Sequence, residues 1–129
     1  MKNAPKPVGD PRRRVGLAGE AAAESRLRRD GLEIVDRGYR ARCGEIDLIA
    51  LDGPVVVFVE VKTRTGVAFG RPAEAVTPDK RRRIARAASV FLARSGWSDR
   101  PCRFDVVEVV PDGSGWRVTR IADAFRTGD

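Results

Sequence analysis

Histidine is absent from this 129-residue chain, and its absence excludes several kinds of chemistry. Without imidazole, the protein cannot build a histidine-based zinc site, a Ser-His-Asp triad or a Cys-His dyad. Any catalysis must therefore use carboxylates, lysine, hydroxyl groups or a metal ion held by oxygen ligands. Sites made only of oxygen ligands favour Mg²⁺, Mn²⁺ or Ca²⁺.

Long apolar runs and numerous cysteines are missing as well. No apolar stretch approaches the roughly 20 residues that a membrane-spanning helix needs, and none follows the N-terminus as it would in a secretory signal. The two cysteines, Cys43 and Cys102, are too few for a disulfide framework. We therefore expect a cytoplasmic protein without membrane contact.

Acidic residues are outnumbered by basic ones, 18 against 25, which gives a formal net charge of +7. A domain this basic attracts polyanions, and nucleic acid is the commonest of them. Only four of the basic residues are lysine, so a GC-rich genome could also explain the excess of arginine. The charge favours a nucleic-acid partner, and a protein-interaction domain with incidental basic charge is the alternative.

The hydrophobic pattern predicts one domain with the element order αβββαββ, and the chain length suits a single core. Apolar stripes at helical spacing predict helices at 15–29 and from about 77–78 to 95–96. Runs of alternating or β-branched residues predict strands at 33–39, 44–51, 54–63, 102–110 and 116–121. The expected fold class is α/β, with a mixed central sheet flanked by helices.

The two ends of the chain are expected to lie outside this domain. Residues 1–14 contain Pro5, Pro7 and Pro11, which oppose helix formation, and the like-charged cluster Arg12-Arg13-Arg14. They are interpreted as a flexible basic arm, which either grips phosphates or is simply solvated. The folded domain is expected at 15–122, followed by a C-terminal tail at 123–129.

The two central strands predict a β-hairpin that gathers acidic side chains. A two-residue turn at Asp52-Gly53 would set Leu51 opposite Pro54, and Asp47 would then face Phe58. Since side chains alternate with period two, one face would carry Glu45, Asp47, Ile49, Phe58, Glu60 and Lys62. Asp47 and Glu60 would be diagonal neighbours with Cα atoms about 7–8 Å apart, a spacing at which both carboxylates reach one cation.

Carboxylates this close repel each other, and a divalent cation would offset that cost. Such a cation would also polarise a phosphate oxygen and acidify a bound water. Lys62, two residues after Glu60, could stabilise the charge that develops on a phosphate. The combination suits phosphodiester hydrolysis, whereas the alternative is that Glu60 and Lys62 are only the polar end of a strand.

Two sequence motifs resemble the YraN-like family of small bacterial proteins. They are Gly-Glu-Ile-Asp-Leu-Ile-Ala at 44–50 and Val-Phe-Val-Glu-Val-Lys-Thr-Arg at 57–64. Further positions that fit the family are Gly16, Gly19-Glu20, Ala23, Phe69-Gly70, Lys80 and Arg103-Phe104-Asp105. The resemblance covers most of the chain and implies a restriction-endonuclease-like core of the PD-(D/E)xK group.

The resemblance also implies roles for particular residues. Asp47 and Glu60 would be ligands of Mg²⁺ or Mn²⁺, with the Val61 carbonyl as a further ligand, and Lys62 would be the catalytic lysine. Glu20 matches an acidic residue that resolvase-type nucleases carry on their first helix, where it would complete the metal shell. An ordinary exposed helical glutamate is the alternative interpretation of Glu20.

The expected function is metal-dependent cleavage of nucleic acid, DNA rather than RNA, on branched or structured substrates. A non-catalytic nucleic-acid-binding module on the same fold is the alternative. Phosphates would be contacted by Arg64, Arg71, Lys80, Arg81 and Arg82, and junction-cutting relatives suggest a homodimer. The chain departs from the family at one point, where Arg37-Gly38 replaces the usual Arg-Asn pair.

Overall fold

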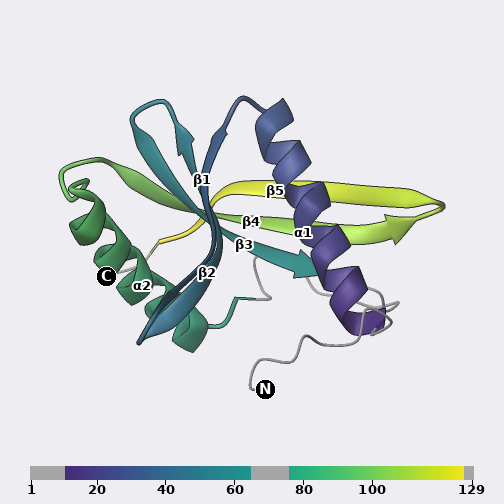
Figure 1. Cartoon of the computed structure of the whole chain (residues 1–129), viewed down its shortest axis with the longest axis horizontal. Coiled ribbons are helices and arrows are strands. Elements are labelled where there is room, and N and C mark those ends of the chain that lie inside the picture. Colours follow the sequence, from purple (N-terminus) through teal and green to yellow (C-terminus); the bar gives the residue numbers. More distant parts are fainter. Residues whose placement is uncertain (1–10, 65–75, 127–129) are drawn as a thin grey trace, which may run out of the picture.

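A computed structural model describes residues 11–64 and 76–126, which form a five-stranded mixed sheet with a helix on each face (Figure 1). The predicted order αβββαββ is confirmed. The elements are α1 (Pro11–Arg29), β1 (Glu33–Ala41), β2 (Gly44–Asp52), β3 (Val55–Thr63), α2 (Pro78–Ser95), β4 (Cys102–Asp112) and β5 (Gly115–Phe125). Neither helix has the length and hydropathy needed to cross a bilayer.

The strands lie in the order β1-β2-β3-β4-β5. Neighbouring strands are antiparallel except β3 and β4, which run parallel. A parallel pair needs a long crossover connection, and α2 lies within the one that joins these two strands. This topology makes β3 the centre of the sheet, between the hairpin partner β2 and the parallel partner β4.

Helix α2 has the ends that its sequence predicted. Thr77 is the N-cap, and its hydroxyl accepts a hydrogen bond from the Lys80 amide at 3.2 Å. Gly96 closes the other end with φ of 73°, in the left-handed region that glycine adopts without strain. These local signals place the helix correctly along the sequence.

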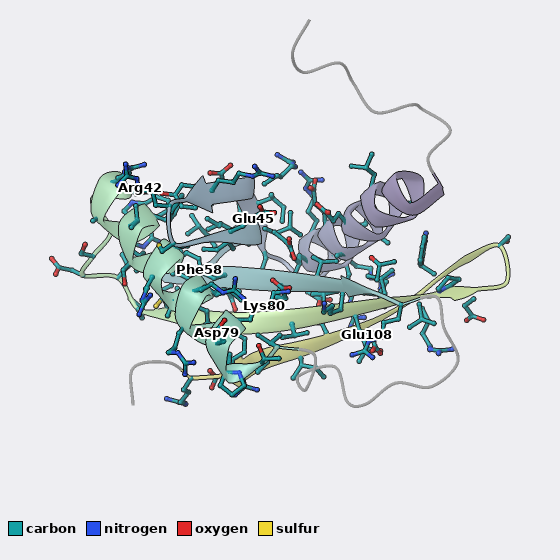
Figure 2. The ribbon with its side chains drawn as sticks, turned by 90° about the horizontal axis from the view of Figure 1, so that it is seen from below. Arg42, Glu45, Phe58, Asp79, Lys80 and Glu108 are labelled. Carbon is teal, nitrogen blue, oxygen red and sulfur yellow. The ribbon has the colours of Figure 1, made fainter. Side chains whose placement is uncertain are left out.

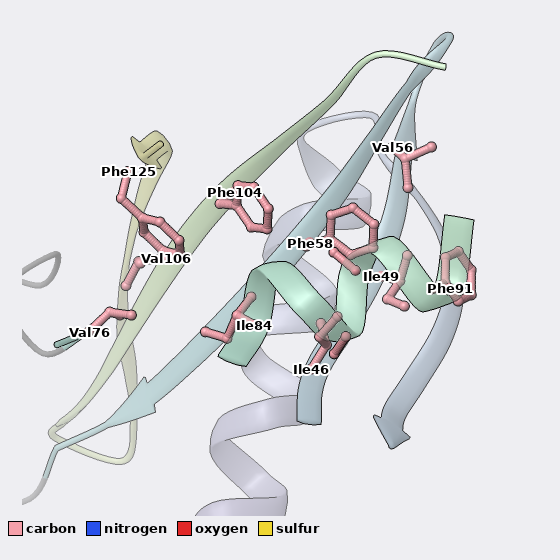
Figure 3. Close-up of a cluster of buried hydrophobic side chains, with 12 residues drawn as sticks. Ile46, Ile49, Val56, Phe58, Val76, Ile84, Phe91, Phe104, Val106 and Phe125 are labelled. Atoms are coloured by element: carbon pink, nitrogen blue, oxygen red, sulfur yellow. The ribbon is translucent and has the colours of Figure 1, made fainter. Parts of the chain in front are cut away.

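The two helices cover opposite faces of the sheet with separate hydrophobic clusters. Helix α1 contributes Ala23 and Leu27 to one cluster. On the other face, Phe58 of β3 lies beneath α2 (Figure 2), with its ring centroid 6.1 Å from that of Phe91. Figure 3 shows Ile84 and Phe91 of α2 packed over the strands in this second cluster.

Two boundaries differ from the expectation. Helix α1 begins at Pro11, inside the segment interpreted as an arm, because proline suits the first turn of a helix, where its missing N–H costs nothing. Strand β5 continues to Phe125, inside the expected tail, because this ring is buried and stacks on Phe104 at a centroid distance of 5.2 Å.

The predicted register of the β2–β3 hairpin is wrong by two residues. Ile49, not Asp47, is opposite Phe58, and Asp52 pairs with Val55. The turn therefore consists of Gly53 and Pro54 instead of Asp52 and Gly53. Proline has no N–H for the ladder, whereas Gly53 with φ of 58° suits the first position of a tight hairpin turn.

The regular alternation of side chains in β2 breaks near Asp47. Leu48 packs in the α1 cluster, yet both Ile46 and Ile49 pack in the α2 cluster. The pairs Arg37–Leu48 and Tyr39–Ile46 flank this point, and Gly38 lies between them with φ of 59°. Asparagine and glycine both tolerate this left-handed conformation, so the departure from the family's Arg-Asn pair preserves the backbone.

Two charged side chains are buried in the described part of the chain, Glu60 and Asp105. Asp105 accepts hydrogen bonds from Arg103 at 3.0 Å, from Arg120 at 3.2 Å and from the Asp123 amide at 2.9 Å. It therefore joins β4 to β5 beneath a small arginine network. The charge of this buried carboxylate is therefore balanced by the two arginines.

We expect Asp105→Asn to lower the free energy of unfolding by about 2 kcal/mol, since it leaves two arginines without their shared anion. Asp52→Asn is the matched control, because Asp52 also pairs with Arg103, at 2.9 Å, but is half exposed; the cost should stay under about 1 kcal/mol. Urea unfolding measures both. Equal costs for the two variants would contradict this account.

Candidate active site

A cavity of about 560 Å³ opens between the β1–β2 hairpin and α2. In Figure 2, Arg42 and Glu45 mark the hairpin side and Lys80 marks the helix side. The described residues that line it are Arg40, Ala41, Arg42, Cys43, Gly44, Glu45, Asp47, Glu60, Lys80, Arg83 and Ile84. Acidic and basic groups are thus gathered around a single hollow.

Asp47 and Glu60 are the predicted carboxylates, and both line this cavity. The β2–β3 ladder ends at the pair Leu48–Val59, and just beyond it an Asp47 carboxylate oxygen (Oδ2) accepts a hydrogen bond from the Val61 amide at 2.7 Å. This bond fixes the Asp47 side chain against β3. Continued by one pair, the observed register sets Asp47 opposite Glu60, which brings the two carboxylates together at the cavity.

Burial and electrostatic repulsion among the carboxylates raise the pKa values of Asp47 and Glu20. Burial, and then the charge of Glu60, raise the pKa of Asp47 to about 7, although the Val61 amide opposes the shift. Burial also raises the pKa of Glu20, with further contributions from Glu45 and Glu60. Glu20 of α1 thus interacts electrostatically with the same group of acidic residues, which is consistent with its predicted role.

A glycine sets how closely α1 approaches the site. A Cβ on Gly19 would collide with the Thr63 hydroxyl, so only glycine lets the helix lie this close to the end of β3. The next residue in the helix is Glu20. Gly19 therefore allows α1 to lie close to β3, and this close packing places Glu20 near the acidic residues of the site.

Lys80 lies in the first turn of α2 and forms an ion pair with Glu60, whose side chain is only 7% exposed. A cation near a helix N-terminus is disfavoured by the helix dipole, so the buried carboxylate compensates for that position. Lys80 was expected to contact phosphate. In this structure its charge partner is the carboxylate at the floor of the cavity.

Lys62, the predicted catalytic lysine, lies in β3 two residues beyond Glu60 and pairs in register with Glu108 of β4. The pleat of β3 directs Lys62 and Glu60 to the same side of the strand. Lys62 is partly exposed and has no ion-pair partner among residues 11–64 and 76–126. It does not line the cavity itself but lies beside it.

The arginines expected to bind phosphate are mostly engaged elsewhere. Arg64 pairs with Glu108 at 2.8 Å and is only 16% exposed. Arg81 donates to the Val76 carbonyl at 2.9 Å and lies over the Phe125 ring. Arg82 is exposed, 3.6 Å from Asp79, and Arg71 falls outside the described residues.

Two arginines that the sequence did not single out, Arg40 and Arg42, line the cavity together with Arg83, one of the arginines on the polar face of the second helix. Arg40 lies near the end of β1, and Arg42 lies in the turn before the Gly44-Glu45 motif. Arg83 is one helical turn after Lys80, a spacing that puts both on one side of α2. The sequence shows that spacing, but it does not show that the hairpin packs against the helix at this point.

The donor set suits an oxygen-liganded divalent cation in chemistry and charge. Asp47, Glu60 and Glu20 offer carboxylates, and their mutual repulsion would be relieved by a cation. In the described residues, however, no three acidic or thiol groups already stand at metal-binding spacing. Glu60 is instead neutralised by Lys80.

An αβββαββ core with an acidic residue on β2 and Glu-x-Lys on β3 defines a restriction-endonuclease-like protein. The profile of the uncharacterised protein family UPF0102 matches residues 19–109. The chain belongs to that family, which is the YraN family of the resemblance.

Several UPF0102 proteins are similar to this chain over most of its length. The one from Symbiobacterium thermophilum is 58% identical over 114 residues, which is 88% of this chain and 97% of the relative. Those of Nocardia farcinica and Rhodococcus jostii are 52% and 47% identical, covering 80% and 86% of this chain and 80% and 95% of the relatives. These similarities extend over at least 80% of this chain in each case.

Proposed function

We propose that this protein is a metal-dependent nuclease that hydrolyses phosphodiester bonds in nucleic acid. The observation that carries the proposal is the pair of carboxylates, Asp47 and Glu60, held at one cavity that Glu45 and four basic side chains also line. Burial and the neighbouring charge of Glu60 raise the pKa of the Asp47 carboxyl group, and a bound cation would offset both effects. DNA, a branched substrate and a homodimer remain predictions.

Asp47, Glu60 and Glu20 are the side chains that would hold Mg²⁺ or Mn²⁺, and the Val61 carbonyl remains a predicted further ligand. The bound ion would polarise a phosphate oxygen and acidify a water molecule. The Val61 amide keeps Asp47 oriented through its 2.7 Å hydrogen bond. Glu60 is buried, so its carboxylate would be offered to the metal ion from a fixed position.

Lys62 would act on the substrate directly. Its ammonium is not used in an ion pair with a described residue, so it can face a non-bridging phosphate oxygen or orient the attacking water. Lys80 would neutralise Glu60 while no metal ion is bound. The two lysines therefore have separate roles, one toward the phosphate and one toward the carboxylate.

One observation favours a second function, a nucleic-acid-binding module without catalysis. The Lys80–Glu60 ion pair already neutralises a carboxylate that the nuclease would need for metal. On this second proposal, binding requires no divalent ion and survives Glu60→Gln. Cleavage is then absent in the wild-type protein too.

The test incubates the purified protein with duplex, single-stranded and branched DNA, and with RNA, in Mg²⁺, in Mn²⁺ and in EDTA. The nuclease proposal expects cleavage of at least one substrate with metal, none with EDTA, and none by Glu60→Gln. Binding without metal-dependent cleavage of any substrate would support the second function. Cleavage by Glu60→Gln at the wild-type rate would point to a contaminating nuclease and overturn the first.

A further inference from the structure

We propose that Arg40, Arg42 and Arg83 form an arginine rim that binds the sugar-phosphate backbone of nucleic acid without reading its base sequence. The rim lies around the same cavity that contains Asp47 and Glu60. It takes over the role that the sequence assigned to Arg64 and Arg81. The inference rests on the proposed function in one respect, that nucleic acid is the ligand.

The rim arginines are available to a ligand, unlike those that they replace. Arg40 is 82% exposed and pairs with Glu45 at 3.2 Å, and Arg83 is 56% exposed and pairs with Asp79 at 3.2 Å. Exposed ion pairs of this kind contribute about 0–1 kcal/mol. A phosphate can therefore replace the carboxylate of Glu45 or Asp79 as the partner of the arginine. Arg42 is exposed and has no ion pair within the described part of the chain.

The two sides of the rim are held at a fixed separation by a close backbone contact. Arg40 and Arg42 lie on the hairpin, and Arg83 lies on α2. A Cβ added to Gly44 would come within 2.7 Å of the Arg83 carbonyl oxygen, so the hairpin and the helix touch at this point. A rim built this way is organised before the ligand arrives, which lowers the entropy cost of binding.

The side chains around the cavity indicate what is recognised. Guanidinium groups bind phosphate oxygens with two parallel hydrogen bonds. Among the described residues that line the cavity there is no aromatic ring to stack a base and no Asn or Gln amide to read a base edge. The side chains around the cavity therefore suit the sugar-phosphate backbone of nucleic acid, which carries no sequence information.

The carboxylates inside the cavity explain why a phosphate would bind at the rim. Asp47 and Glu60 would repel a phosphate that entered the cavity without a cation, whereas the three arginines attract one to its mouth. The rim would hold a strand across the opening, with a phosphodiester above the carboxylates. Backbone binding at the rim therefore needs no metal, although cleavage does.

Binding is measured by fluorescence anisotropy in EDTA, with labelled oligo-dT and oligo-dA of equal length, a mixed-sequence duplex and an RNA strand, over a range of salt concentrations. For single strands, each lost phosphate contact should reduce the slope of log K against log salt by about 0.7, and for duplex by about 0.9. Arg42→Ala and Arg83→Ala should each show this reduction, and the double variant about twice as much. Oligo-dT and oligo-dA should bind within a few-fold of each other.

Arg94→Ala is the matched control, since Arg94 is exposed on the same helix but does not line the cavity; its slope should equal that of the wild type. The inference is overturned if the double variant keeps the wild-type slope, if Arg94→Ala reduces it equally, if oligo-dT and oligo-dA differ more than about tenfold, or if the wild type binds no nucleic acid. Because the assay contains no metal, normal rim binding without any cleavage would overturn only the nuclease proposal. Cleavage with unchanged binding by the rim variants would overturn only this inference.

Discussion

Lys62→Ala should reduce the rate of metal-dependent DNA cleavage by about 10²- to 10³-fold, the usual cost of losing one group that stabilises transition-state charge. The proposal gives Lys62 contact with the reacting phosphate, and no described residue competes for its ammonium. Since the side chain is partly exposed, its loss should change the melting temperature little. Single-turnover cleavage in Mn²⁺ measures the effect.

Arg82→Ala provides the control for Lys62→Ala, because Arg82 is an exposed cation that does not line the cavity. It should cleave within a few-fold of the wild-type rate. Lys62→Ala should also bind DNA nearly as well as the wild type in EDTA. A Lys62→Ala protein that cleaves at the wild-type rate would remove Lys62 from the mechanism.

The metal-free protein should lose thermal stability as the pH rises from about 4 to about 7. The pKa of Asp47 is raised from 3.8 in the unfolded chain to about 7 in the folded one. The folded state therefore keeps a proton that the unfolded state has released. Stability from this group is fully present below the unfolded pKa and is lost as the pH passes through the folded one.

The size of this decline should be on the order of 10–20 °C in melting temperature, because a rise of about three pKa units corresponds to about 4 kcal/mol and each kcal/mol shifts the melting temperature of a domain of this size by about 3–5 °C. Scanning calorimetry in EDTA between pH 4 and pH 8 measures it. Glu24 has the opposite dependence, because its hydrogen bond with Arg37 lowers its pKa. Its contribution is lost only at more acidic pH, so the two effects separate.

Asp47→Asn should abolish most of this decline and raise the melting temperature at pH 8. Asparagine cannot ionise, and its carbonyl oxygen can still accept the hydrogen bond from the Val61 amide. Asp52→Asn, a control on the same strand, should keep the wild-type profile because Asp52 is half exposed and lies outside the cavity. A decline that persists in Asp47→Asn would assign it to another group.

Local signals in the sequence were sufficient for the order of elements and for the ends of α2. Thr77-Pro78 and Ser95-Gly96 determine those ends through hydrogen bonds and φ angles that depend on neighbouring residues only. The family motifs identified Asp47 and Glu60 as a pair, and both line the cavity. This much of the site is encoded within short segments.

The remaining features depend on contacts between distant segments. The strand period of two could not reveal that alternation breaks at Asp47, because that break accompanies the unusual backbone of Gly38 on the neighbouring strand. The hairpin register could have been corrected from Pro54, which cannot donate to the ladder.

The arginine rim depends on the contact of Gly44 with α2, which no local pattern encodes. Charge alone could not separate an arginine that faces the cavity from one that is engaged in packing, such as Arg81 over Phe125. Arg81, which is engaged in packing, and Arg83, which lines the cavity, lie only two residues apart in α2. Their roles are therefore assigned only once the helix is placed against the sheet.

The central claim is that Asp47 and Glu60 together bind one divalent cation, and a crystal soaked in Mn²⁺ tests it most directly. The account predicts a single anomalous peak between the two carboxylates, with Lys80 turned away from Glu60. The peak should be absent in crystals of Asp47→Asn soaked in the same way. No peak at this position in the wild-type protein, with Lys80 still paired to Glu60 at saturating Mn²⁺, would contradict the claim.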